Sequence, residues 1–175
     1  MKGEGNLVRE WVRPDKLRIT IDYPSGRERR VVNGLTGSRD GMPVNGPQLD
    51  AMILQSARIG LPALLIEHRQ DLRDLGPRER SGRTFDVIEI PLSTYMSIEI
   101  EIDRPTGHIA RSIGHAAVPG SNARLEFMAV YDDYRKADGL LFAFHEENFA
   151  SGFKTGMTAL EKVEVVTTPA AGAKR

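Results

Sequence analysis

The residues of this chain best suited to chemistry are a histidine and its two acidic neighbours, His145, Glu146 and Glu147. Imidazole and carboxylate groups are both zinc ligands, but a zinc-binding helix of the HExxH type needs a second histidine four residues later. This segment lacks that histidine, and its alternation predicts a strand rather than a helix. We therefore predict no metal site and no cofactor, and we expect these side chains to lie at a solvated strand end.

Asp132, Asp133, Arg135 and Asp138 form a second group around a predicted hairpin. Paired carboxylates can act as a general acid and a general base. Aspartate is also a common turn former, which explains these residues without any catalytic role. Since no two acid–base residues have the spacing of a catalytic motif, we predict that the protein is not an enzyme. A cofactor-free enzyme that uses Asp133 or His145 stays the third hypothesis.

The composition argues against several other classes of function. The chain has 175 residues, with 24 Lys plus Arg and 24 Asp plus Glu, so its formal net charge is zero. Because proteins that bind nucleic acids are usually basic, we predict no nucleic-acid partner. The chain contains no cysteine, which excludes disulfides, thiolate metal sites and cysteine nucleophiles. Its apolar runs are too short to predict a transmembrane segment.

Segment 47–72 is the long stretch with helical periodicity, and its apolar side chains recur three and four residues apart. Gly60 and Pro62 interrupt the pattern, which predicts two helices that meet at an angle. Most other segments alternate between apolar and polar residues, as strands do; residues 16–23 and 95–103 are examples. The pattern predicts an α+β fold of eight to ten antiparallel strands, with the helices inserted after the early hairpins.

The remaining segments set the expected boundaries. Residues 37–46 are rich in glycine and residues 75–82 are polar, so both are predicted as loops. Residues 157–166 alternate again and are predicted as the last strand. We expect a single domain over residues 1–168 and a flexible tail over residues 169–175.

Four stretches combine strand alternation with characteristic turns. They are RPDKLRITIDYPSGRERRVVNG at 13–34, IEIEIDRPTGHIAR at 98–111, VYDDYRKADGLLFAF at 130–144 and LEKVEV at 160–165. In these stretches the chain resembles the outer-membrane lipoprotein carrier family, whose members have the LolA-like fold. The resemblance implies a half-open antiparallel β-barrel with a two-part helix over its concave face. It also implies an apolar cavity between sheet and helices, where carriers of this type hold lipoprotein acyl chains.

The apolar faces of the strands and helices supply the expected wall and lid of such a cavity. The predicted ligand-binding residues are Ile19, Ile21, Met52, Ile53, Leu61, Leu64, Leu65, Ile98, Ile100, Phe127, Phe142 and Phe144. Apolar alternation is also what an ordinary filled core requires, so the pattern leaves both interpretations open.

The leading hypothesis is binding or carriage of an apolar ligand, a lipid or a lipoprotein acyl chain, in the periplasm. A membrane-associated protein is a further expected partner. The N-terminus lacks the apolar core of a signal peptide, so we expect either a cytoplasmic protein or a mature domain whose export signal was removed. The alternative hypothesis is a non-catalytic interaction domain trimmed from a larger envelope protein.

Overall fold

The computed structural model describes residues 3–118 and 120–166, which contain twelve strands and two helices. The strands are β1 (Asn6–Val12), β2 (Lys16–Tyr23), β3 (Gly26–Asn33), β4 (Thr36–Arg39), β5 (Met42–Pro43), β6 (Arg73–Arg80), β7 (Arg83–Pro91), β8 (Met96–Asp103), β9 (Ile109–Ala117), β10 (Arg124–Ala137), β11 (Leu140–Ala150) and β12 (Phe153–Ala159). The helices are α1 (Gly46–Ile59) and α2 (Leu61–Glu67).

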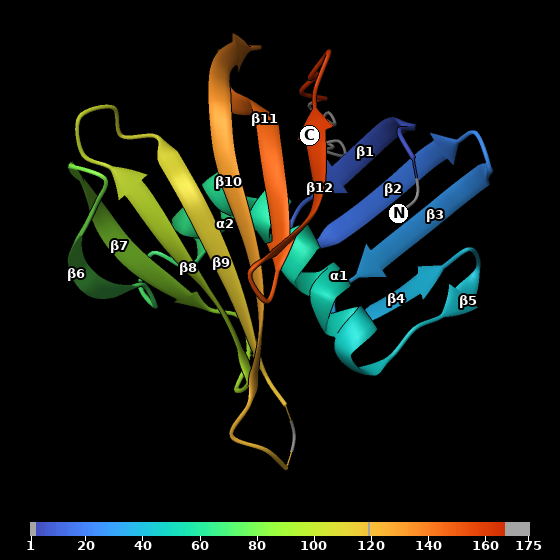
Figure 1. Cartoon of the computed structure of the whole chain (residues 1–175), viewed down its shortest axis with the longest axis horizontal. Coiled ribbons are helices and arrows are strands. Elements are labelled where there is room, and N and C mark those ends of the chain that lie inside the picture. Colours follow the sequence, from blue (N-terminus) through green and yellow to red (C-terminus); the bar gives the residue numbers. More distant parts are fainter. Residues whose placement is uncertain (1–2, 119, 167–175) are drawn as a thin grey trace, which may run out of the picture.

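The strands form two antiparallel sheets in which each strand pairs with its neighbours in sequence. One sheet has the order β1-β2-β3-β4-β5 and the other has the order β12-β11-β10-β9-β8-β7-β6. No strand pair joins the two sheets among the described residues, and the helices lie between them (Figure 1). The predicted α+β fold is confirmed, with sheets that stay open and do not close into a barrel.

The helical segment breaks where the sequence predicts. Helices α1 and α2 meet at 83°, and Gly60 lies between them. A Cβ atom at Gly60 would lie 2.3 Å from Cζ2 of Trp11, so the indole of β1 can pack directly on the helix backbone. Neither helix in the described residues is long and apolar enough to span a membrane by itself; the bent pair meets that test of length and composition only when taken together.

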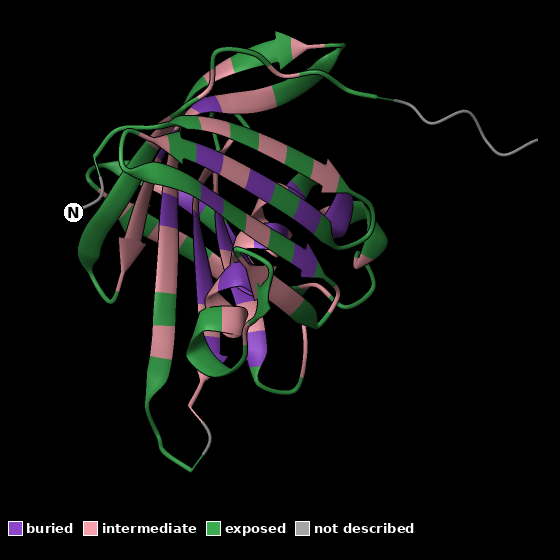
Figure 2. Cartoon of the chain, turned by 90° about the vertical axis from the view of Figure 1, so that its right-hand side faces the viewer, coloured by how far each residue is buried: buried purple, intermediate pink, exposed green. Residues whose placement is uncertain are grey.

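Alternation along the strands directs one apolar face of each sheet toward α1. In β2, Leu17, Ile19 and Ile21 are buried while the residues between them are more exposed, and the same banding runs through both sheets (Figure 2). Glycines allow the helix to approach closely on both sides. Cβ positions at Gly37 in β4 and Gly114 in β9 would each lie 3.0 Å from a leucine of α1. Helix α1 therefore lies between the two sheets and packs against both of them.

The described residues contain twelve strands, so the prediction of eight to ten is too low. The extra strands β4, β5 and β6 occupy the segments predicted as loops, 37–46 and 75–82. Strands β5 and β6 are sheet edges and β4 pairs with β5; their side chains are exposed or half-buried, so apolar alternation did not reveal them.

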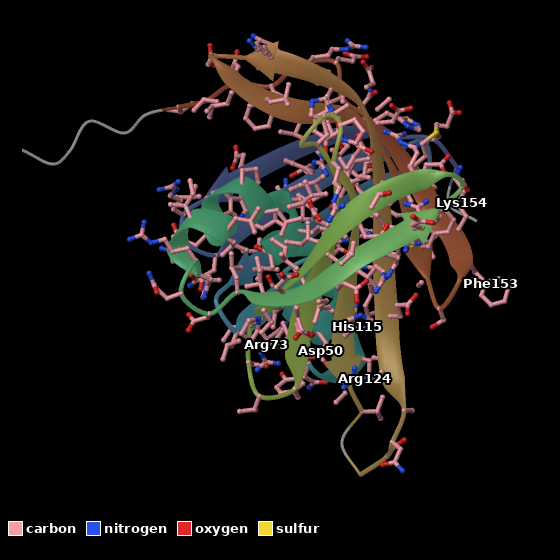
Figure 3. All side chains as sticks on the ribbon, turned by 90° about the vertical axis from the view of Figure 1, so that its left-hand side faces the viewer. Asp50, Arg73, His115, Arg124, Phe153 and Lys154 are labelled. Carbon is pink, nitrogen blue, oxygen red and sulfur yellow. The ribbon has the colours of Figure 1, made fainter. Side chains whose placement is uncertain are left out.

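The last strand also differs from its prediction, since β12 ends at Ala159 and residues 160–166 are not strand. Strand β12 is an edge of the seven-stranded sheet, and its Phe153 projects from that edge with 78% exposure (Figure 3). The predicted tail, residues 169–175, lies outside the described residues, and the domain boundary at residue 168 stays a prediction.

Candidate functional site

Ten of the twelve predicted ligand-binding residues lie together between the helices and the sheets. Ile19, Ile21, Met52, Ile53, Leu61, Leu64, Ile98 and Ile100 belong to one buried apolar cluster, and Leu65 and Phe127 pack against it. Phe142 and Phe144 of β11 are not part of this cluster. The ring of Phe144 is instead covered by the guanidinium of Arg135, 4.8 Å from the ring centroid. The predicted set is thus the central core, and its role in ligand binding stays a proposal.

A pocket of about 220 Å³ with a mixed polar and apolar lining lies beside α1. It is lined by Arg30, Arg39, Gln48, Ala51, Met52 and Gln55. Met52 also belongs to the apolar cluster and is 5% exposed, so its side chain separates the pocket from the core. A second hollow, of about 450 Å³, lies over the start of β1 and the end of β2, and its lining includes none of the predicted residues.

The pocket wall rests on a buried carboxylate, Glu28, which is 2% exposed. Glu28 accepts hydrogen bonds from Nε of Arg30 at 2.6 Å and from Nη2 of Arg39 at 2.9 Å. Arg30 Nη1 also donates to Oε1 of Gln55, 3.3 Å away on α1. We call Glu28, Arg30, Arg39 and Gln55 the Glu28 cluster. It connects β3 and β4 to the helix and presents two guanidinium groups to solvent.

A second carboxylate, Glu146 of β11, lies between arginines from two other elements. Arg9 of β1 donates from Nη1 to Oε2 at 2.9 Å, and Arg58 of α1 donates from Nη2 to Oε1 at 3.0 Å. Burial would raise the pKa of the Glu146 carboxyl, but the positive charges of Arg58 and Arg9 outweigh this and hold the pKa below its ordinary value. The three residues, the Glu146 cluster, link both sheets to α1 through an ionised carboxylate.

Tyr131 of β10 lies beside the Glu146 cluster, and its hydroxyl is 2.7 Å from that of Ser112. Burial raises the pKa of Tyr131 to about 12, with the negative charge of Glu146 adding to the rise and Arg58 and Arg9 opposing it. Tyr131 therefore stays protonated at neutral pH. Nearby, Arg58 Nε and Asn148 Oδ1 are buried without a hydrogen-bond partner among the described residues.

The prediction of a solvated strand end was wrong for Glu146, which is 7% exposed. Neighbouring residues of a strand point to opposite faces, so Glu146 points inward like Phe144 while His145 and Glu147 point the other way. The apolar residues at 142 and 144 are the sequence signal that places position 146 on the inner face. Nothing local indicates its partner, because Arg9 is 137 residues away.

Of the second acidic group, Asp138 lies in the turn after β10, whereas Asp132, Asp133 and Arg135 lie within that strand. Asp133 and Asp138 both have positive φ, 52° and 49°. The side-chain hydrogen bond from Arg135 holds the pKa of Asp133 below its ordinary value, which makes this carboxylate a weak base. Among the described residues, no group of three or more histidine, aspartate or glutamate side chains is arranged to hold a metal ion.

The face of the seven-stranded sheet away from the helices carries a third buried carboxylate, Glu101 of β8. It accepts hydrogen bonds from Arg78 and Arg80 of β6 at 2.9 Å and from Arg111 of β9 at 2.5 Å. The partners all come from strands of one sheet, so among the described residues this cluster of ion pairs makes no contact with the helices.

Comparison with known proteins gives one similar solved structure. No protein-family model matches the chain, and no curated protein matches its sequence. The chain is similar in structure to a domain from Vibrio parahaemolyticus. That crystal structure is assigned to an outer membrane lipoprotein-sorting protein; the match covers 91% of this chain and 78% of the other, with 10% sequence identity and a TM-score of 0.42.

Proposed function

We propose that this protein binds a long apolar ligand, such as an acyl chain, between the helix pair and the two sheets. The observation that carries the proposal is the position of α1, which separates two sheets that share no strand pair among the described residues. The apolar core is therefore closed by side-chain packing of a helix rather than by a continuous hydrogen-bonded wall. Displacing α1 exposes the inner apolar faces of both sheets together.

The chemistry of the core suits such a ligand. Burial of each acyl CH₂ group contributes about 0.8 kcal/mol, so a chain of about ten such groups contributes on the order of 8 kcal/mol toward opening the core and ordering the ligand. Met52, Leu61 and Leu64 belong to the apolar core cluster, and Leu65 packs against it. A bound ligand would take over some of the contacts that these side chains make with the rest of the cluster. A methionine side chain is flexible and adapts to an irregular occupant.

Polar contacts limit how the helix can move. Gln55 is tied to β3 through Arg30, and Arg58 is tied to β11 through Glu146. The first contact is partly exposed, with a donor–acceptor distance of 3.3 Å, whereas the second is a buried ion pair. We infer that ligand entry begins on the Gln55 side and leaves the Arg58 contact in place. The periplasmic location and a lipoprotein acyl chain as the natural ligand belong to the same proposal.

Uptake of a fluorescent fatty acid tests the proposal directly. Leu65→Gln and Ile66→Gln are a matched pair on α2, because Leu65 packs against the core and Ile66 is 67% exposed. We expect the native chain and Ile66→Gln to bind the probe equally, and Leu65→Gln to bind at least several-fold more weakly. Native mass spectrometry of the gently purified protein should also show a bound lipid. A lipid-free protein that takes up no probe would rule the proposal out.

Fractionation of cells that produce the full-length protein tests the location. Recovery in the periplasmic fraction is the expected result, and recovery in the cytoplasm would remove the envelope part of the proposal while leaving ligand binding intact.

A further inference from the structure

The pocket beside α1 has the composition of an anion site. One wall carries the guanidinium groups of Arg30 and Arg39, and the helix side carries the carboxamides of Gln48 and Gln55. These two arginine side chains are 29% and 37% exposed, so solvent reaches both of them. Each guanidinium has five N–H donors, which is more than its contacts with Glu28 and Gln55 use. Donors therefore remain available to a ligand.

The charge balance of the pocket favours an anion. Glu28 neutralises only one of the two guanidinium groups, and its own side chain is buried behind them. Asp40 is the other nearby carboxylate, 3.9 Å from Arg39 Nε. It lies outside the pocket lining, is half exposed, and accepts a hydrogen bond from the backbone N–H of Arg29. Asp40 thus offsets part of the charge of Arg39 from outside the pocket, while the lining itself carries two guanidinium groups and no carboxylate.

The volume of the pocket limits the size of the bound group, and Met52 in its lining indicates where an attached apolar chain could pass. At about 220 Å³ the pocket is smaller than the roughly 300–1,000 Å³ that encloses a drug-sized molecule, so it fits a head group and not an acyl chain. Its apolar floor is Met52, which is buried and belongs to the core cluster. A rotation of this flexible side chain would open a path from the arginines into the apolar interior.

We propose that this pocket binds the anionic head group, a carboxylate or phosphate, of a single-chain amphiphile whose apolar chain passes Met52 into the core. This inference rests on the proposed apolar-ligand function and adds the head-group chemistry and its location. Arginine is suited to both head groups because its planar fork donates two parallel hydrogen bonds to a carboxylate or a phosphate.

The test compares dodecanoate, dodecyl phosphate, dodecanol and inorganic phosphate as ligands, measured by calorimetry on the native chain and two variants. Arg39→Gln removes one pocket guanidinium. Arg29→Gln is the matched control, because it removes the same charge from an exposed neighbour in β3 that does not line the pocket. Urea unfolding checks that both variants remain folded.

We expect the two anionic amphiphiles to bind the native chain more tightly than dodecanol does. Arg39→Gln should weaken their binding about tenfold or more, as expected for loss of a charge-assisted hydrogen bond, and should leave dodecanol binding unchanged. Arg29→Gln should bind all ligands as the native chain does.

Three results would overturn the head-group site. Equal binding of dodecanol and dodecanoate, unaffected by Arg39→Gln, would leave apolar binding intact but remove the anion site. Binding of inorganic phosphate alone would show an anion site without an amphiphile and would count against both proposals. Binding of none of the four would also end both.

Discussion

The Glu28 and Glu146 clusters contain the same types of residue but differ in how far their side chains are exposed to solvent. Each places one buried carboxylate between two arginines beside α1. The arginine side chains of the Glu28 cluster are 29% and 37% exposed, whereas Arg9 and Arg58 are 13% and 11% exposed. The exposure of the arginines, rather than of the carboxylate, therefore decides which cluster can meet a ligand.

The two clusters also differ in what they connect. The arginines of the Glu28 cluster come from adjacent strands of one sheet, and the Arg30–Gln55 contact reaches the helix. The Glu146 cluster joins β1, α1 and β11, so it links two sheets that no strand pair joins among the described residues. We interpret the first cluster as part of a binding surface and the second as a structural link.

The largest expected effect comes from removing the charge of the structural link. Glu146→Gln leaves Arg9 and Arg58 buried without their counter-ion, so we expect the free energy of unfolding to fall by about 3–5 kcal/mol. Glu28→Gln leaves arginines that can turn to water, so its loss should be less than half as large. Urea unfolding at neutral pH measures both. Equal losses in the two variants would show that exposure does not distinguish the clusters.

Acid should reduce the difference in the free energy of unfolding between the native chain and Glu146→Gln. The pKa of Glu146 is below its ordinary 4.5 in the folded state, because Arg58 and Arg9 outweigh the effect of burial. The charge of Glu146 therefore stabilises the fold fully above about pH 4.5, and this contribution is lost as the pH falls through the folded-state pKa. The stability gap should be constant at higher pH and narrow below about pH 4.5. A gap that widens in acid would contradict this assignment.

Gly60→Ala tests the packing that holds the structural link together. The new Cβ would lie 2.3 Å from Cζ2 of Trp11, which is two residues from Arg9 on the same face of β1. Displacing the indole should cost about 1–3 kcal/mol of stability. Gly114→Ala is the comparison, because its Cβ would meet the buried side chain of Leu54 at 3.0 Å, a less severe overlap than 2.3 Å. Its smaller loss should appear in the same urea titrations, and a loss equal to that of Gly60→Ala would show that Trp11 has no special role.

The sequence was sufficient to predict many of the strands and the two helices, but not the side-chain contacts between residues far apart in the chain. Alternation in 16–23 and 95–103 predicted two strands, and Gly60 with Pro62 predicted the break between the helices. These signals are local, so a single sequence is sufficient to detect them. The Arg9–Glu146 contact spans 137 residues and depends on how two sheets meet at a helix, which no local pattern specifies.

The pocket escaped prediction for a related reason. Arg39 lies in β4, in a glycine-rich segment that was predicted as a loop, and its place beside Arg30 in the pocket follows from the pairing of β4 with β3. Of the predicted ligand-binding residues, Met52 is the one that lines it. Apolar alternation pointed to ten residues in or against the core cluster but carried no information about the pocket beside α1.

The smallest expected effect is a change in how Tyr131 titrates. Burial raises its pKa to about 12, and the negative charge of Glu146 contributes to that rise. Removing this charge in Glu146→Gln should lower the pKa of Tyr131, because phenolate formation no longer faces a nearby carboxylate while Arg58 and Arg9 continue to favour it. Glu28→Gln should leave the titration unchanged, since Glu28 is not among the groups that act on Tyr131.

Near-ultraviolet absorbance during alkaline titration measures this pKa, with Tyr131→Phe identifying the signal among the four tyrosines. Circular dichroism at each pH restricts the comparison to folded protein. An identical Tyr131 titration in the native chain and Glu146→Gln would mean that solvent screens this carboxylate. That result would remove the electrostatic difference between the two clusters, because a screened Glu146 would hold its arginines no more strongly than the open cluster holds its own.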